Sequence, residues 1–188
     1  MIFHATPLAD LFEIETRPRG DERGQFTRYY CEQALAQVSP GARVLQINHS
    51  FTQHAGTVRG LHYQAAEGGN AACEGKLVRC LRGRVWDVAV DLRRGSPTVG
   101  HWHAVEMHAE AGGRQLWIPP GFAHGFQALC DEVEMLYLHT AAYAPAQDAG
   151  LRFDDPTLAV AWPLPARLLS PRDQALPLLQ HDFEGVQV

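Results

Sequence analysis

The stretch RVWDVAVDL, residues 84–92, decides the fold class, because its residue types alternate with a period of two. One set of alternate positions would share one face of an extended chain: Trp86, Val88, Val90 and Leu92. The other set would share the opposite face: Val85, Asp87, Ala89 and Asp91. This alternation predicts a β-strand.

Working outward from it, further stretches read as strands: residues 76–82, 101–109, 114–119 and 133–140. The segments between them are rich in glycine, proline and charge, including 93–100, the segment PPGFAHG at 119–125, and 130–132. Many short strands at regular spacing predict an all-β barrel or sandwich. We expect one helix over 31–38 and turns with short helices from residue 163 onward.

Composition excludes several classes of protein. A length of 188 residues favours one domain, and a net charge of −5 argues against a nucleic-acid partner. No apolar run reaches the ~18–20 residues needed to span a bilayer, and no basic segment precedes an apolar run at the N-terminus. We therefore expect no membrane partner. The four cysteines form no zinc pattern, so we expect reduced thiols and a cytoplasmic location.

The basic residues are unevenly chosen, because Lys76 is the only lysine among 16 lysines and arginines. A position that keeps lysine in an arginine-rich chain is consistent with a need for a compact ammonium group. The alternative is chance survival, and composition alone does not separate the two.

The histidines offer two kinds of candidate site. His101, His103 and Glu106 resemble the ligand set of a metal-binding cupin, although a half-exposed strand is the plainer reading. His62 and His124 each lie close to glycines, where a backbone can approach a ligand closely. From the residues alone, the prediction is a β-barrel with a candidate histidine site.

Four stretches together carry a family resemblance: RGLHYQ at 59–64, residues 76–102, LWIPPGFAHGF at 116–126, and DDPTLAVAWPL at 154–164. They resemble the dTDP-4-dehydrorhamnose 3,5-epimerase family from about residue 5 to about residue 178. The resemblance implies a cupin-type jelly-roll β-barrel with short peripheral helices, formed by residues 1–188 as a single domain. It also implies that no metal and no redox cofactor are needed.

The resemblance implies a mechanism as well. In such substrates a ketone at C4 acidifies the hydrogens on C3 and C5, so a base can remove one and leave an enolate. By motif match the base is His62, and Tyr137 returns a proton from the opposite side of the ring. Asp173 would hold the histidine, and Lys76 would stabilise the enolate charge.

The same resemblance implies a nucleoside-diphosphate site. Arg23 and Arg59 would meet phosphate oxygens, and Tyr143 would stack on the base. The remaining matched polar contacts are Gln46, Asn48 and, near the sugar, His124. The N-terminal segment of about residues 1–50 would contribute to a homodimer and bring Arg23 to the neighbour's site, while residues 163–188 would pack on the barrel.

Some positions depart from the family pattern. Arg28 stands where an acidic residue is usual, Asp148 where glutamate is common, and Arg172 where lysine is common. These three are also matched to substrate contacts. The loop at 65–75 is a few residues longer than usual.

Several functions therefore remain open at this point. The favoured one is inversion of C3, C5 or both in a 4-keto-6-deoxy nucleotide sugar. The alternatives are a single-position epimerase acting on another nucleotide sugar, a metal-dependent cupin enzyme using His101, His103 and Glu106, and a barrel that binds nucleotide sugars without catalysis.

Overall fold

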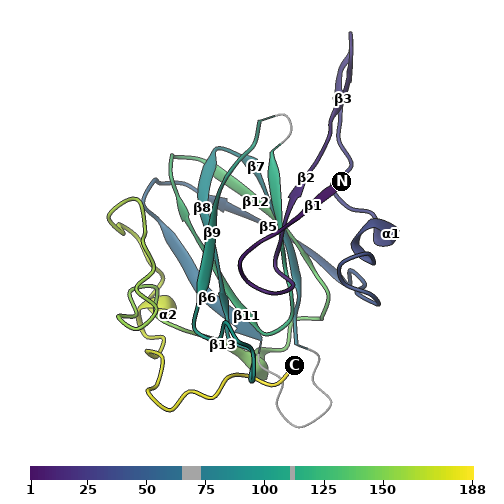
Figure 1. Cartoon of the computed structure of the whole chain (residues 1–188). Coiled ribbons are helices and arrows are strands. Elements are labelled where there is room, and N and C mark those ends of the chain that lie inside the picture. Colours follow the sequence, from purple (N-terminus) through teal and green to yellow (C-terminus); the bar gives the residue numbers. More distant parts are fainter. Residues whose placement is uncertain (65–72, 111–112) are drawn as a thin grey trace.

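The computed structural model describes residues 1–64, 73–110 and 113–188, and its strands form two antiparallel sheets of a jelly-roll barrel (Figure 1). In spatial order, the first sheet contains β1 (Ile2–Ala5), β2 (Phe12–Glu15), β10 (Arg114–Ile118), β7 (Lys76–Arg82), β12 (Val133–His139) and β5 (Gln46–Thr52). The second contains β13 (Asp148–Gly150), β6 (Val58–Gln64), β11 (Phe122–Ala128), β8 (Arg84–Asp91) and β9 (Trp102–His108).

The remaining elements lie around this barrel. A separate hairpin of β3 (Arg19–Asp21) and β4 (Gly24–Phe26) projects away from the body of the molecule (Figure 1). The helices are α1 (Glu32–Leu35), the 3₁₀-helix η1 (Pro145–Gln147) and α2 (Pro171–Gln174). Within the described residues, no helix has the length and apolar character to cross a membrane.

The main core lies between the two sheets. Val85 and Ala89 of β8 contribute to it, and the first sheet contributes inward-facing residues such as Val78 and Met135. Val88 and Val90, on the other face of β8, belong to a second cluster outside the barrel. The two-face prediction for residues 84–92 is therefore confirmed, and both faces are buried.

Segments outside the sheets cover both outer faces. Leu179, Phe183 and Val186 of the C-terminal tail pack on the outer cluster of the second sheet. Leu35 of α1 packs with Trp117 on the outer face of the first sheet. These layers explain how strands in a chain of this length become buried on both sides.

Two expectations about local structure need correction. The helix expected over 31–38 forms there, but it is only the four-residue α1. The segment 119–125 was expected to be a break, but its later part begins β11, in which every residue is buried. Gly125 in β11 packs against Gly60 in β6, where a Cβ on Gly60 would lie 2.5 Å from the Gly125 Cα. The glycines therefore allow the two strands to approach and do not end them.

The inner surface of the barrel changes from apolar to polar along its strands. On β12, Met135 is followed at the next inward positions by Tyr137 and His139. On β7, Val78 is preceded by Lys76, which pairs in register with His139. Polar groups thus gather inside one end of the barrel.

Candidate active site

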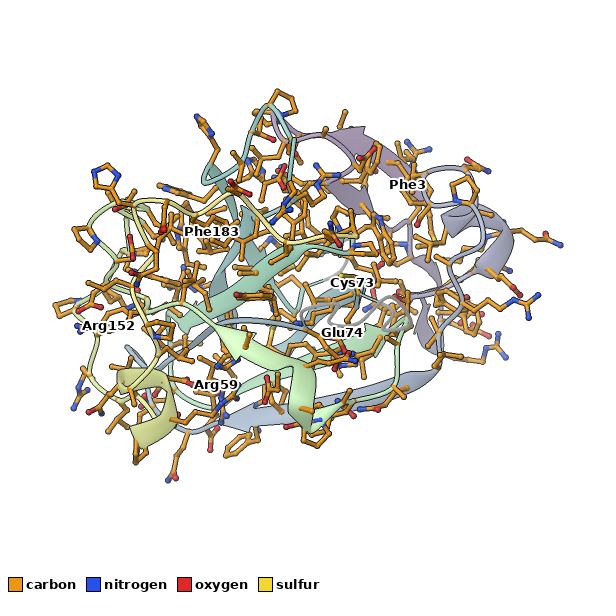
Figure 2. The ribbon with its side chains drawn as sticks, turned by 90° about the horizontal axis from the view of Figure 1, so that it is seen from below. Phe3, Arg59, Cys73, Glu74, Arg152 and Phe183 are labelled. Atoms are coloured by element: carbon orange, nitrogen blue, oxygen red, sulfur yellow. The ribbon has the colours of Figure 1, made fainter. Side chains whose placement is uncertain are left out.

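The polar end of the barrel contains a pocket of about 550 Å³. Side chains from both sheets and from α2 line it, and Arg59 lies on the side of the barrel where α2 is found (Figure 2). Eight of the site residues predicted from the sequence line this pocket: Asn48, Arg59, His62, Lys76, His124, Tyr137, Arg172 and Asp173. The fold therefore brings together residues from distant parts of the chain.

His62 on β6 is paired with Asp173 on α2. The Nε2 atom of His62 lies 2.7 Å from Asp173 Oδ1, and the Gly60 amide donates to Asp173 Oδ2 at 3.4 Å. Ser170 caps α2 by accepting from the Asp173 amide, which fixes the carboxylate's position. Asp173 is buried, whereas His62 is partly open to the pocket.

The protonation state of His62 follows from these surroundings. Burial lowers its pKa below the ordinary value, although the hydrogen bond and charge of Asp173 oppose the shift. A neutral His62 that donates from Nε2 to Asp173 leaves Nδ1 as the nitrogen able to accept a proton. The pair therefore has the arrangement of an oriented general base.

Tyr137 reaches the same pocket from the other sheet. Its hydroxyl lies 2.9 Å from the Ser50 hydroxyl on the neighbouring strand β5. Burial raises the pKa of the Tyr137 phenol well above its ordinary value, so the group is protonated and able to donate. His62 and Tyr137 thus offer a base and an acid from opposing walls.

His124 stands beside His62, because the two residues pair directly in the register of β11 and β6. Its Nε2 lies 3.0 Å and 2.9 Å from the two carboxylate oxygens of Asp87 on β8. Burial raises the pKa of the Asp87 carboxyl, while His124 and Lys76 oppose the shift. Asp87 therefore fixes the orientation of the His124 ring, which lies edge-on to Tyr137 at 6.2 Å between centroids.

Lys76 also lines the pocket, at the first position of β7. Its Nζ lies 3.2 Å from Glu74 Oε2 and 3.4 Å from the backbone oxygen of His62. An ammonium has three donors, and these contacts use two of them. The longer loop noted at 65–75 falls mostly outside the described residues, since 65–72 are not described.

A smaller cavity of about 210 Å³ adjoins the pocket and shares Asn48, His62 and Lys76 with it. Tyr143, Asp148 and Gln46 are among its other lining residues. Arg172 donates to Asp148 Oδ1 at 2.7 Å, and the Tyr143 hydroxyl donates to Asp148 Oδ2 at 3.0 Å. The Tyr143 ring is more than half exposed, so one face is accessible for stacking.

Arg23 and Arg28 are not brought to this pocket within one chain. Arg23 lies in the projecting β3–β4 hairpin, where its Nε donates to Asp21 Oδ2 at 3.1 Å. Arg28 lines a separate depression next to that hairpin, with Arg17 and Phe26. Their predicted contacts with the substrate therefore require another copy of the chain or a movement of this segment.

The alternative metal site does not form. His103 points inward with Val105 and Met107 and lies 3.0 Å from Glu13 Oε1. Glu106 is exposed on the opposite face of β9 and pairs with Arg84. Among the described residues, no group of three or more histidine, cysteine, aspartate or glutamate side chains is placed to hold a metal ion.

Sequence reasoning missed four residues at this site: Ser50, Glu74, Asp87 and His139. Asp87 had a usable signal, because it alternates with Val85 and Ala89 on the face that proves to be inside. Glu74 and His139 had no local signal, since their contact depends on the pairing of β7 with β12.

The fold and the pocket together define a cupin-type barrel with His62 and Tyr137 on opposing sheets at its polar end. Comparison with known families agrees, since the family described as dTDP-4-dehydrorhamnose 3,5-epimerase matches residues 5–181. The enzyme of that name from Salmonella typhimurium is 44% identical over 184 residues, covering 95% of this chain and 96% of the relative. The one from Sinorhizobium fredii is 41% identical over 180 residues, covering 95% and 90%.

Solved structures are similar as well. The dTDP-6-deoxy-D-glucose-3,5-epimerase from Legionella pneumophila, in complex with dTDP-4-keto-L-rhamnose, has a TM-score of 0.86 at 40% identity, covering 94% of this chain and 92% of that one. A 3'-monoepimerase from Streptomyces bikiniensis, in complex with dTDP-quinovose, has a TM-score of 0.82 at 33% identity, covering 93% and 86%.

The chain belongs to the dTDP-4-dehydrorhamnose 3,5-epimerase family. The predicted family, the cupin-type fold and the enzyme class, a nucleotide-sugar isomerase, are thereby confirmed.

Proposed function

We propose that this enzyme inverts C3 and C5 of a dTDP-linked 4-keto-6-deoxy sugar through an enolate. The observation that carries the proposal is the placement of the His62–Asp173 pair and Tyr137 in one pocket, on opposing sheets. Inversion needs a base on one face of the sugar ring and a proton donor on the other.

Each step uses a group whose protonation state fits it. Neutral His62 takes a proton from the carbon next to the ketone through Nδ1, and the electron pair moves onto the C4 oxygen as an enolate. Tyr137 then gives its phenolic proton to the opposite face of that carbon. Proton exchange with water resets His62 and Tyr137 before the second carbon reacts.

Lys76 supplies the cation that stabilises the enolate oxygen, and it acts as a fixed charge inside the barrel. The His124–Asp87 pair stands beside His62 and offers a second polar contact to the sugar. We propose no metal and no redox cofactor in this reaction, since a proton transfer next to a ketone requires neither.

The nucleotide would occupy the adjoining cavity. Tyr143 would stack on the base, Gln46 and Asn48 line the same cavity, and Asn48 also lines the larger pocket. Arg59 and Arg172 border the larger pocket and offer guanidinium groups to the two phosphates. Asp148 holds Arg172 in place through its 2.7 Å contact.

We further propose a homodimer in the cytoplasm. Ile47 and Phe51 are exposed on the outer face of the edge strand β5, and Leu45 is exposed just before that strand begins. Phe26 is 73% exposed at the base of the projecting hairpin, whose turn carries Arg23. A second copy would cover these apolar groups and receive the hairpin, with Arg23 and Arg28, at its own substrate site. The cytoplasm would keep the four cysteines reduced.

Mass spectrometry of the product formed in heavy water tests the function. Incubation with dTDP-4-keto-6-deoxyglucose is expected to add two deuterium atoms, one at C3 and one at C5. Incorporation of one deuterium would identify a single-position epimerase. No incorporation by the folded protein would contradict the proposal and favour a barrel that only binds nucleotide sugars.

A further inference from the structure

Lys76 is paired with Glu74, which is in turn paired with His139, and the reaction itself requires neither of these two side chains. Glu74 Oε2 lies 3.2 Å from the Lys76 Nζ, and Glu74 Oε1 lies 2.6 Å from His139 Nδ1. The three side chains are each only about a tenth exposed, at 10%, 10% and 11%. Figure 2 labels Glu74, which lies two positions before the catalytic lysine in the chain.

The hydrogen bonds around this group have a defined direction that starts at the nucleotide end. The backbone amide of Tyr143 donates to Gln46 Oε1 at 3.3 Å. The other amide atom of Gln46, Nε2, therefore donates, and it does so to Asn48 Oδ1 at 3.1 Å. Each of these contacts fixes which end of the next amide group must act as a donor.

The same direction sets the state of His139. With its oxygen used by Gln46, Asn48 presents its Nδ2 donor to His139 Nε2 at 3.2 Å. That ring nitrogen must accept, so the imidazole is neutral and carries its proton on Nδ1. The Nδ1 proton is then donated to Glu74 Oε1 at 2.6 Å.

Glu74 is the last member of this series of hydrogen bonds, and its carboxyl group is ionised. Burial opposes its ionisation, but the His139 hydrogen bond and the Lys76 charge outweigh burial, and the pKa of Glu74 lies below its ordinary value. One oxygen faces His139 and the other faces Lys76. The strand register supports this arrangement, because His139 pairs with Gln46 on one side and with Lys76 on the other.

We propose that Glu74 and His139 are positioning residues that hold the Lys76 ammonium at the sugar and connect it through Asn48 and Gln46 to the nucleotide end. The proposal rests on the role of Lys76 in the proposed function. A lysine has a flexible four-carbon stem, so an ammonium without a fixed partner samples many positions. The Glu74 carboxylate and the His62 backbone oxygen take two of its donors and leave the third directed elsewhere.

The connection predicts how substrate binding and lysine position influence each other. A nucleotide that stacks on Tyr143 and contacts Gln46 or Asn48 orders the first members of the series. Because the hydrogen bonds run without a break to Glu74, that order extends to Lys76. The cation would then be placed before the enolate forms, which avoids reorganisation during the reaction.

The chain offers an unusually direct test, because Lys76 is its only lysine. Protein grown with ¹³C-labelled lysine gives the Lys76 signal alone, and ¹³C relaxation measures the order of its Cε group without substrate or turnover. The variants are Glu74→Gln, His139→Leu and His139→Gln. The matched control is Glu13→Gln, which removes the carboxylate from another partly buried glutamate–histidine pair, with His103, outside the pocket.

In Glu74→Gln and His139→Leu, the order parameter of Lys76 Cε is expected to fall toward the range below ~0.6 that marks a flexible group. Turnover is expected to fall ~10- to 100-fold with a smaller change in KM, because the cation is misplaced in the transition state. A glutamine amide can accept and donate as the neutral imidazole does, so His139→Gln should stay within about threefold of the wild type. Glu13→Gln should change neither quantity.

The possible results distinguish the positioning role of Glu74 and His139 from the role of Lys76 in the proposed function. An unchanged Lys76 order parameter in folded Glu74→Gln would overturn the positioning role. A reduced order parameter with unchanged turnover would support the positioning and instead contradict the assigned role of Lys76 in the enolate step. Failure of His139→Gln to differ from His139→Leu would overturn the directed hydrogen-bond connection.

Discussion

Asp173 Oδ1 lies 2.7 Å from His62 Nε2, although 111 residues separate the two in the chain. The contact joins a strand of the barrel to a four-residue helix in the C-terminal segment, and Ser170 caps that helix. The segment that covers the outside of the barrel therefore also orients the proposed base. Loss of this segment's packing would disturb the chemistry as well as the fold.

The first prediction concerns His62→Ala, which removes the proposed base. Hydrogen exchange at both sugar carbons should fall ~10²–10⁴-fold, the usual contribution of a general base. NMR of the substrate in heavy water measures the exchange, and circular dichroism checks the fold. Near wild-type exchange in a folded variant would remove His62 from the mechanism.

The second prediction concerns pH. The pKa of His62 in the free protein lies below its ordinary value, so the base stays neutral and kcat/KM holds as the pH falls through ~6.5. The rate should decrease only where His62 itself takes up a proton. In Asp173→Asn the carboxylate that favours the protonated ring is lost, so this decrease should move to still lower pH.

The kcat/KM of Asp173→Asn at neutral pH should also fall at least ~10-fold, or ~1.4 kcal/mol, because the ring loses its charged partner. A pH–rate profile of kcat/KM measures both effects in one experiment. Movement of the acid limb to higher pH in this variant would contradict the assigned pairing.

The sequence alone was sufficient to predict strands whose residue types alternate within the strand itself. The strands at 76–82 and 133–140 were recognised because their residue types alternate, and β7 and β12 lie there with nearly the same bounds. Strand β11 was missed because Gly121 and Gly125 look like chain breaks. Gly121 in fact precedes the strand, and the reason for Gly125 lies in another strand, where the backbone of Gly60 packs against it.

The candidate site shows the same limit. The proposed roles of His62 and Tyr137 came from family motifs, and the structure places both in one pocket. Glu74 escaped notice because its partner His139 is 65 residues away, and only the pairing of β7 with β12 joins them. Arg23 was predicted from its motif, but within a single chain it lies in the projecting hairpin and not at the pocket.

A third prediction is that Lys76→Arg is nearly as damaging as Lys76→Met. Arginine keeps the charge, but its wider guanidinium would displace the sugar or turn away from the enolate oxygen, and an error of ~1 Å can cost ~10²-fold. The side chain is only 10% exposed and is confined by Glu74, which leaves little room for the larger group. Steady-state turnover decides the matter, and high residual activity in Lys76→Arg would contradict the need for a compact cation.

A fourth prediction tests the exchange of the hairpin between subunits. Arg23→Ala and His62→Ala chains should each be poorly active, and mixing them after unfolding and refolding should restore activity. Half of the dimers formed at random are mixed, and one of their two sites is intact, so about a quarter of wild-type turnover is expected. If Arg23 served its own chain, mixing would restore nothing.

Tyr137→Phe provides the most direct test of the central claim, that a base and an acid act from opposing walls of one pocket. The change keeps the ring and removes only the hydroxyl. Proton NMR in heavy water follows, in one sample, both the loss of the C3 and C5 hydrogens and the appearance of inverted product. We predict that hydrogen exchange continues through His62 while inversion falls ~10²-fold or more. Unchanged inversion in Tyr137→Phe would contradict it and would assign the proton donor to another group.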